Sequence, residues 1–284
     1  MEAPQRIRAS RVDGVINWIG HYRPDSDILF SYGSIKKIGK SKKTNFETRG
    51  QSSKKKKLAA WLVSHCYTGG RRELLVQSLQ KYIPVDSYGK CGDFKCPSHG
   101  DCREYLAKNY KFYLAFENSI CLDYVTEKMY YNLRQDIVPV TYAWINDTHA
   151  LPPNSYINAF DFRSVKALAD YLVHLDQDED EYAKYFEWKR QYRVVQTYGL
   201  CEACGRLLKH RENTNGPHRS RQKVRRYKSM LAWLNDIPGG SDGGRNEATA
   251  QLRVGNQLVI TNQTCVRPAD NKILMNWISD LNNS

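Results

Sequence analysis

Residues Tyr110–Lys128 read Tyr-Lys-Phe-Tyr-Leu-Ala-Phe-Glu-Asn-Ser-Ile-Cys-Leu-Asp-Tyr-Val-Thr-Glu-Lys. The apolar run Lys111–Phe116 ends abruptly in polar residues, which is typical of a buried strand. The segment Tyr124–Leu133 that follows is predicted to be a helix. A buried strand that leads through a short polar loop into a helix is typical of an α/β fold with a parallel sheet.

The same alternation extends in both directions from this stretch. Strands that alternate with helices argue for a parallel sheet with helices on both faces. Further strands are expected at residues 14–19, 27–32, 58–64, 83–88, 137–142 and 155–160, and further helices at 71–81, 165–175, 179–193, 198–210 and 219–234. Residues 238–244 (Pro-Gly-Gly-Ser-Asp-Gly-Gly) read as a flexible linker, and the residues after them carry no usable pattern.

The polar junction after Phe116 is the expected ligand site, because open parallel sheets bind ligands beyond the carboxyl ends of their strands. Helix N-terminal amides attract phosphate, and Lys128 could add a positive charge there. Glu127 could accept hydrogen bonds from sugar hydroxyls, and Asn118 offers both a donor and an acceptor. The residues alone leave a plainer alternative equally open: Asp123 or Thr126 caps the helix, and Glu127 and Lys128 are solvated.

The charge of the chain points to an anionic ligand but not to nucleic acid. The 284 residues carry a net charge of +13, and the isoelectric point is near 9.3. The basic residues are concentrated in two runs, 36–57 and 219–228, which suggest a solvated loop and one face of an amphipathic helix. Positive charge also helps a protein to hold a nucleotide diphosphate, so no nucleic-acid partner is expected.

The eight cysteines indicate a secretory compartment. Two groups have spacings that a zinc site could use: Cys91, Cys96 and Cys102 with His99, and Cys201 and Cys204 with His210. Neither group contains two Cys-x-x-Cys pairs, as a typical zinc site of this kind does. Disulfides are therefore the favoured interpretation, and no metal ligand is assigned. N-glycosylation sequons at Asn146, Asn262 and Asn282 fit the same compartment weakly. No run of about 20 apolar residues and no signal peptide is present.

The stretch Tyr110–Lys128 resembles the signature of the α-1,3-fucosyltransferases of glycosyltransferase family 10. Weaker matches extend from about residue 1 to 210. They are Tyr22-Arg-Pro-Asp-Ser-Asp27, Ser31-Tyr32-Gly33, Ala60-Trp-Leu-Val-Ser64, Tyr82-Ile-Pro-Val-Asp86, Tyr88-Gly-Lys-Cys91, Ala150–Ile157 and Leu175–Asp178. The cysteine loop and the lysine-rich insert are similar to those of plant and invertebrate enzymes that fucosylate the N-glycan core. Transfer onto lactosamine is the other acceptor that the resemblance allows.

The resemblance implies the GT-B fold, in which two Rossmann-like domains face a cleft. It divides the chain into the remnant of an N-terminal acceptor domain (1–35), a basic loop (36–57), a Rossmann-like GDP-fucose-binding domain (58–236), and a linker with an unassigned tail (237–284). The donor contacts that it implies are Tyr32, Val63, Ser64, Arg72, Asn118, Tyr124, Glu127 and Lys128. Arg72 and Lys128 would face the diphosphate of GDP-fucose, and Glu127 would hold the fucose.

The implied general base is Glu2, which precedes Asn17 by a spacing close to that of the family's base motif. It would deprotonate the 3-hydroxyl of an N-acetylglucosamine in an N-glycan or glycoprotein acceptor, with inversion at fucose. No cofactor is required, although a divalent metal could stimulate the reaction. The family's complete enzymes are Golgi type II membrane proteins with a lumenal catalytic domain, so this chain is expected to be truncated at its N-terminus.

The sequence departs from the family in ways that keep a second function open. His65 stands where the family usually has asparagine, and residues 142–149 differ from the glycine-containing loop expected there. In the family, the cysteines that correspond to Cys201 and Cys204 are tied to the N-terminal domain, so here they are expected to be thiols or to be paired differently. The alternative function is a non-catalytic remnant that still binds GDP-fucose.

Overall fold

The computed structural model describes residues 14–39, 55–146, 151–197, 199–215, 250–261 and 265–279. These residues form two compact units. The larger unit contains residues 32–196, 251–259 and 265–284, and the smaller contains residues 1–31, 197–250 and 260–264. The predicted base Glu2, most of the basic loop and the predicted helix 219–234 lie outside the described residues.

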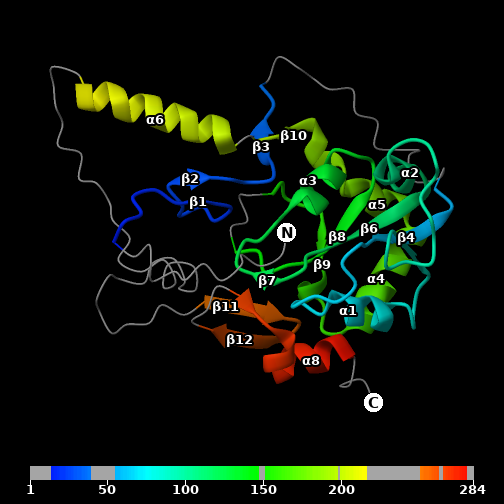
Figure 1. Ribbon diagram of the computed structural model, residues 1–284. Helices are drawn as coiled ribbons and strands as arrows, with labels where there is room; N and C mark the ends of the chain where they lie inside the picture. The colour runs from blue at the N-terminus through cyan, green and yellow to red at the C-terminus, as the bar shows by residue number, and fades with distance from the viewer. Residues whose placement is uncertain are drawn as a thin grey trace. The chain divides into compact units, whose positions relative to one another are not determined.

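The larger unit is built on a parallel sheet of five strands in the order β5-β4-β6-β8-β9 (Figure 1). The strands are β4 (Lys57–Leu62), β5 (Val85–Tyr88), β6 (Tyr110–Phe116), β8 (Val138–Tyr142) and β9 (Ile157–Asn158). Every residue of β6 and β8 is buried, because helices cover both faces of the sheet. The predicted α/β class with a parallel, Rossmann-like sheet is therefore confirmed.

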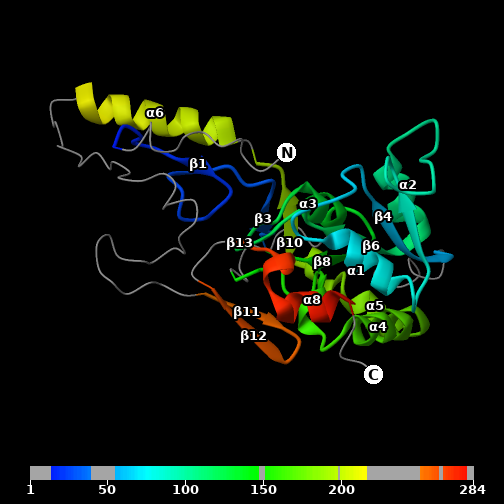
Figure 2. The same cartoon turned by 60° about the horizontal axis from the view of Figure 1, so that its bottom comes forward.

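Two layers of helices cover the sheet. The helices of this unit are α1 (Arg72–Leu79), α2 (Cys102–Asn109), α3 (Glu127–Leu133), α4 (Val165–Gln177), α5 (Glu179–Lys184) and α8 (Lys272–Ser279). Helix α1 contacts α4 and α8, and α8 lies beside α1 in both ribbon views (Figures 1 and 2). Helices α2 and α3 pack on β4, β6 and β8. Because β4-α1-β5 and β6-α3-β8 run in opposite directions across the sheet, right-handed crossovers place α1 and α3 on opposite faces.

The strand order reverses between β4 and β6. The chain passes from β4 outward to β5, and then returns past β4 to β6 before continuing to β8 and β9. The loops after β4 and β6 consequently leave the carboxyl edge of the sheet at neighbouring positions. This reversal is the topological switch point, where doubly wound sheets bind ligands.

Short strands extend the larger unit on both sides of the main sheet. Strands β3 (Ser34–Lys37) and β10 (Tyr192–Val195) form an antiparallel pair, and β7 (Ile120–Cys121) pairs antiparallel with β13 (Cys265–Val266). Strands β11 (Ala250–Val254) and β12 (Gln257–Thr261) also pair. Gly255, at the turn between them, has a φ of 56° and donates its amide to the carbonyl oxygen of Phe160. A Cβ at this position would lie 2.6 Å from the Cα of Arg163, so only glycine fits.

The C-terminal residues belong to the sheet unit, although the sequence shows no pattern for them. Leu274, Trp277 and Ile278 of α8 are buried, and the indole nitrogen of Trp277 donates to the carbonyl oxygen of Phe162. A disulfide joins Cys265 of β13 to Cys121 of β7. The tail that was left unassigned at 237–284 therefore supplies part of the larger unit's core.

Three other differences separate the structure from the sequence-based expectations. Residues 102–109 form α2 where only a cysteine loop was expected, because Asp101 caps that helix by accepting a hydrogen bond from the amide of Arg103. The helix predicted over 179–193 ends at Lys184, and a 3₁₀ turn (Glu187–Arg190) leads into β10. Strand β3 crosses the predicted boundary at residue 35 because it pairs with β10.

The described residues of the smaller unit form two short parallel strands and one long helix. Strands β1 (Gly20–His21) and β2 (Ile28–Leu29) replace the longer strands predicted at 14–19 and 27–32. Helix α6 (Gly199–Asn215) contacts β2, and the guanidinium of Arg206 hydrogen-bonds the carbonyl oxygen of Asp27.

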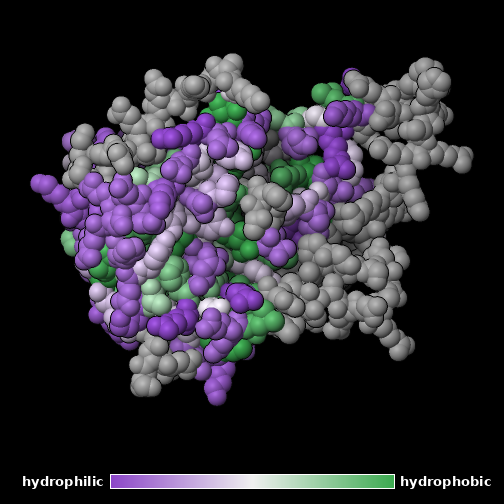
Figure 3. Space-filling view, turned by 180° about the vertical axis from the view of Figure 1, so that it is seen from behind, coloured by the Kyte–Doolittle hydropathy of each residue, from purple (hydrophilic) through white to green (hydrophobic). Residues whose placement is uncertain are grey.

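The surface is strongly polar, in keeping with the charge of the chain. The face shown in Figure 3 is mostly hydrophilic, with small hydrophobic areas between the polar side chains. No helix in the described part of the chain has the length and apolar character needed to cross a membrane.

Six of the eight cysteines are paired. The disulfides are Cys66–Cys91, Cys96–Cys102 and Cys121–Cys265. The zinc alternative for Cys91, Cys96 and Cys102 is therefore wrong, since all three sulfurs are in disulfides. Cys201 and Cys204 are exposed free thiols on α6, as expected if they do not find other partners. The described residues contain no group of three or more histidine, cysteine or acidic side chains placed to hold a metal ion.

Candidate functional site

The loops after β4 and β6 are joined by a direct backbone hydrogen bond. The amide of Gly70 donates to the carbonyl oxygen of Asn118 at 2.8 Å. A Cβ on Gly70 would lie 3.0 Å from that oxygen, so the close approach of the two loops favours glycine at this position. Each loop also contains a residue with positive φ directly before or near a helix: Arg71 (53°) and Asp123 (56°). Such conformations cost free energy and are frequent at binding sites.

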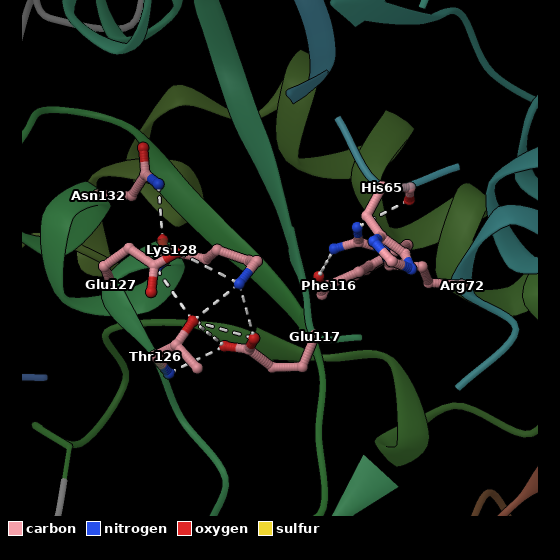
Figure 4. A network of polar contacts seen from close by, with 8 residues as sticks. All are labelled: His65, Arg72, Phe116, Glu117, Thr126, Glu127, Lys128 and Asn132. Carbon is pink, nitrogen blue, oxygen red and sulfur yellow. Dashed lines mark hydrogen bonds and ion pairs between the residues drawn. The ribbon is translucent and has the colours of Figure 1, made fainter. Parts of the chain in front are cut away.

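Arg72 lies beneath this junction and connects the ends of both strands. Its guanidinium donates to the carbonyl oxygen of Phe116 at 2.8 Å and to that of His65 at 3.2 Å (Figure 4). The side chain is buried and lies over the ring of Trp61. Burial, which the charges of Glu117 and Glu73 offset only in part, lowers the pKa of Arg72. Arg72 therefore positions the strand ends, rather than standing as a surface residue at the start of α1.

A second cluster lies at the start of α3 and is built around the buried carboxylate of Glu117. Glu117 is only 1% exposed and follows β6 directly. It accepts hydrogen bonds from the amide and the hydroxyl of Thr126 at 2.8–2.9 Å, and from the ammonium of Lys128 at 3.0 Å (Figure 4). Burial raises the pKa of Glu117, and Lys128 and Thr126 offset this effect only in part.

Lys128 connects Glu117 to the exposed side of the site. Its ammonium contacts Glu117, Thr126 and the carboxylate of Glu127, the last at 3.3 Å. Burial is the largest single effect and opposes the ionisation of Glu127. The charge of Lys128 and the hydrogen bonds that the carboxylate accepts together outweigh it, so the pKa of Glu127 lies below its ordinary value. An exposed carboxylate and a partly exposed ammonium thus lie side by side at the carboxyl edge of the sheet.

Two tyrosines complete this cluster. Burial raises the pKa of Tyr32, and the negative charges of Glu127 and Glu117 raise it further. A hydrogen bond with the side chain of Tyr124 counteracts this shift. Tyr32 therefore lies close to Tyr124 and Glu127, although it is separated from them in the sequence by about ninety residues.

The structure shows how the start of this helix is capped. Thr126 caps α3, which begins at Glu127 rather than at Tyr124. The amide of Thr126 is already bonded to Glu117, and that of Lys128 to the Thr126 hydroxyl. The plainer alternative is correct about the cap, but Lys128 is held in ion pairs rather than solvated.

Two buried polar atoms at this junction have no hydrogen-bond partner among the described residues. They are the side-chain oxygen of Asn118 and the Nε of Arg72. Buried polar atoms are nearly always paired, so these two atoms are candidates for contact with a ligand.

The remaining predicted site residues are Val63, Ser64 and Glu2. Val63 is buried, and its amide and carbonyl groups bond to Tyr88 and Cys91, away from the Glu117 cluster. Ser64 is exposed in the loop after β4. Glu2 lies outside the described residues, so the structure gives it no position.

Sequence reasoning missed Glu117, Thr126 and Gly70 as site residues. A charged residue directly after a seven-residue buried strand was the available signal for Glu117. The Gly69-Gly70 pair before α1 was the corresponding signal for a close approach of backbones.

The fold and the site define the class of protein. It has a doubly wound α/β domain with paired cationic and anionic groups at the switch point of its sheet. The sequence model of the family described as "Glycosyltransferase family 10 (fucosyltransferase) C-term" matches residues 52–232 of this chain. The chain therefore belongs to glycosyltransferase family 10, as its sequence predicted.

Curated relatives from invertebrates carry matching names. The chain is 38% identical over 227 residues to alpha-(1,3)-fucosyltransferase C of Drosophila melanogaster, a match covering 73% of this chain and 53% of the relative. It is 40% identical over 214 residues to alpha-(1,3)-fucosyltransferase fut-1 of Caenorhabditis elegans, covering 70% and 49%. The chain thus spans about half the length of the curated relatives that it matches.

A solved structure of an alpha1,3-fucosyltransferase with GDP-fucose is also similar. It is 25% identical and has a TM-score of 0.39, and the match covers 47% of this chain and 39% of the solved chain. A second solved alpha1,3-fucosyltransferase has a TM-score of 0.41 at 22% identity. The match covers 48% of this chain and 38% of the solved chain.

Proposed function

We propose that this chain carries the donor-binding part of an inverting α-1,3-fucosyltransferase. The reaction moves L-fucose from GDP-fucose to the 3-hydroxyl of an N-acetylglucosamine in an N-glycan or a related glycan. The observation that carries the proposal is the Lys128–Glu117–Thr126 cluster with Glu127 beside it, placed at the switch point of the sheet. The names of the relatives support the same reaction.

Lys128 is the proposed contact for the diphosphate of GDP-fucose. Its ammonium is held by Glu117 and Thr126, and the side chain as a whole is 20% exposed, which leaves room for a phosphate oxygen to approach. An ammonium fixed in this way offsets the negative charge that builds up on GDP as it leaves. Because the cation is already oriented, little conformational entropy is lost when the nucleotide binds.

Glu127, Asn118 and the two tyrosines are the proposed contacts for the sugar and the remaining donor groups. The lowered pKa of Glu127 keeps its carboxylate ionised at neutral pH, so it accepts hydrogen bonds from fucose hydroxyls. The unpaired side-chain oxygen of Asn118 adds a further acceptor. Arg72 supports these contacts by fixing the ends of β4 and β6, and its free Nε is the only proposed direct contribution.

The compartment and the further partners are proposed on the same basis. Three disulfides fit an enzyme that folds in the secretory pathway and acts in the Golgi lumen. The partners proposed are GDP-fucose and an N-glycan or glycoprotein acceptor, and the complete protein is proposed to be anchored in the Golgi membrane. The enzyme is proposed to need no metal, since Lys128 supplies the positive charge.

Calorimetric titration with GDP-fucose tests the donor site. We expect saturable binding by the full chain that is weakened about ten- to a hundredfold in Glu127→Ala, which corresponds to the loss of a charged hydrogen bond. The matched control is Glu181→Ala, which removes an exposed carboxylate that pairs with Lys184 on α5. Equal affinity of Glu127→Ala and the unmodified chain, or no binding by a folded chain, would contradict the proposal.

Replacement of the proposed base separates the enzyme from a binding remnant. We expect Glu2→Gln to lower the rate of fucose transfer by about a hundredfold or more, the lower limit for loss of a general base, while GDP-fucose binding is retained. The measurement is transfer to an N-glycan acceptor beside the same calorimetric titration. Transfer that is equal in Glu2→Gln and the unmodified chain would exclude Glu2 as the base. A chain that binds GDP-fucose but shows no transfer even when unmodified would support the remnant.

A further inference from the structure

A pocket of about 790 Å³ lies beside the edge strand β9. Its walls come from the segment 151–156 before β9, from β9 and the segment after it, from α4, from the residues after α5, and from the β3–β10 pair. This volume is within the range of about 300–1,000 Å³ that small-molecule sites occupy. Strands β6 and β8 separate β9 from β4 in the sheet, and none of the residues that line the pocket belongs to the loops after β4 and β6.

Five of the thirteen residues that line this pocket are aromatic. Tyr156, Tyr171, Tyr185 and Tyr192 come from four different segments of the chain and all face it. The hydroxyl groups of Tyr171 and Tyr185 hydrogen-bond each other at 2.8 Å, which fixes both rings. The rings of Phe162 and Tyr171 lie 5.2 Å apart and extend the same apolar wall. Flat, fixed rings of this kind bind the apolar face of a ring-shaped ligand with little loss of entropy.

Two polar side chains in the lining are available to a ligand. Asp161 and Asn154 make no side-chain hydrogen bond to another residue in the described ranges. Partial burial raises the pKa of Asp161, and burial with the nearby Asp161 charge raises that of Tyr156 to about 12. Asn154 has a φ of 51°, in the left-handed region that asparagine adopts more readily than most non-glycine residues.

The edge position of β9 adds backbone groups to this set. Ile157 and Asn158 pair with β8 on one side only, so the backbone groups on their outer side have no strand partner. Both residues line the pocket. Donors and acceptors from backbone and side chains therefore surround a space bounded by aromatic rings.

The charge of the lining selects the ligand class. No lysine or arginine is among the described residues that line the pocket, in a chain whose net charge is +13. A phosphate or carboxylate there would meet the Asp161 carboxylate without a compensating cation. A neutral ring with many hydroxyl groups would instead donate hydrogen bonds to Asp161 and Asn154 and lay its C–H face on the tyrosines.

We infer that this pocket is a second carbohydrate site, which binds a neutral saccharide separately from the nucleotide-sugar donor. The inference stands on the pocket's own lining and does not need the proposed transfer reaction. In a glycan-modifying enzyme such a site would hold a part of the acceptor that does not react.

Saturation-transfer NMR with N,N′-diacetylchitobiose and with N-acetyllactosamine tests this site on the full chain. We expect binding of at least one disaccharide, weakened about tenfold or more in Asp161→Ala and in Asn154→Ala, because each removes a hydrogen-bond acceptor from the pocket. The matched control is Asp170→Ala on α4, whose carboxylate pairs with Lys166 at 2.7 Å and does not line the pocket. Saccharide binding of this control should equal that of the unmodified chain.

Two further measurements keep the outcome unambiguous. GDP-fucose titration of Asp161→Ala should match that of the unmodified chain, which checks folding and shows that the two sites are separate. Addition of guanosine should leave the disaccharide signal unchanged. A folded chain that binds neither disaccharide, binding that is unaffected in both pocket variants, or displacement by guanosine would overturn the inference, whatever the result for GDP-fucose.

Discussion

Replacing Lys128 by alanine is expected to lower the free energy of unfolding by about 3–5 kcal/mol, the usual effect of breaking a buried ion pair. Glu117 is 1% exposed, and among the described residues Lys128 is the only cation within hydrogen-bond distance of it. Without the ammonium, an ionised carboxylate would remain buried with only Thr126 as a partner. Urea denaturation followed by circular dichroism measures the change. The matched control is Lys166→Ala, an exposed ion pair expected to contribute under about 1 kcal/mol.

The double variant Glu117→Gln with Lys128→Ala isolates the cause. It removes both charges and should recover most of the stability lost in Lys128→Ala. The pH dependence of the single variant provides a second check. Burial already raises the pKa of Glu117 above its unfolded value, and removing Lys128 raises it further. The folded state then binds more protons than the unfolded state, so stability falls as the pH rises above about 4.5. A loss that is the same at about pH 5 and about pH 7.5 would contradict this account.

Removal of the Cys121–Cys265 disulfide is the second change with a large expected effect. The two cysteines are 144 residues apart, and no other disulfide of the described chain falls within that loop. Closing a loop of this length in the unfolded chain is worth about 5 kcal/mol. Cys121→Ala with Cys265→Ala should therefore lower the free energy of unfolding by about that amount under non-reducing conditions, again measured in urea.

The short disulfide supplies the comparison for this prediction. Cys96 and Cys102 are 6 residues apart, so replacing both by alanine should cost only about 2 kcal/mol. If the two double variants lost equal stability, loop length would not be the cause. The two double variants should also differ in ligand binding, because Cys121 lies within the loop after β6. GDP-fucose binding should weaken when Cys121 and Cys265 are replaced, and should not change when Cys96 and Cys102 are replaced.

The central sheet was predictable from the sequence because its strands are buried on both faces. Strands β4, β6 and β8 are largely apolar runs, and polar residues follow soon after β4 and β6, a pattern that needs no knowledge of distant contacts. The order of those strands was not predictable in the same way. The reversal between β4 and β6 depends on where α1 and α2 cross the sheet.

Elements that depend on distant pairing were the ones that sequence reasoning missed. The segment predicted as a helix to residue 193 ends in β10, because Tyr192–Val195 pairs with Ser34–Lys37 more than 150 residues earlier. Residues 265–266 form a strand only because they pair with β7. Local patterns contain no record of such contacts, so tertiary structure overrides local propensity there.

In the candidate site too, the residues within one motif were predictable, whereas those brought in by the fold were not. Glu127, Lys128 and Asn118 follow one another along a quoted motif, whereas Tyr32 reaches them only through the fold. Glu117 was hidden by its position at the end of an apolar strand, where a lone carboxylate looks like a simple strand terminator. Its importance is apparent only from its burial and from the ammonium 3.0 Å away.

The bonds between the loops after β4 and β6 have a consequence for variation among related enzymes. Gly70 and Asn118 meet backbone to backbone, and Arg72 holds the carbonyl groups of Phe116 and His65 together. Neither loop can change its course alone without breaking contacts to the other. We therefore expect the two loops to vary as one unit among related enzymes, changing together or not at all.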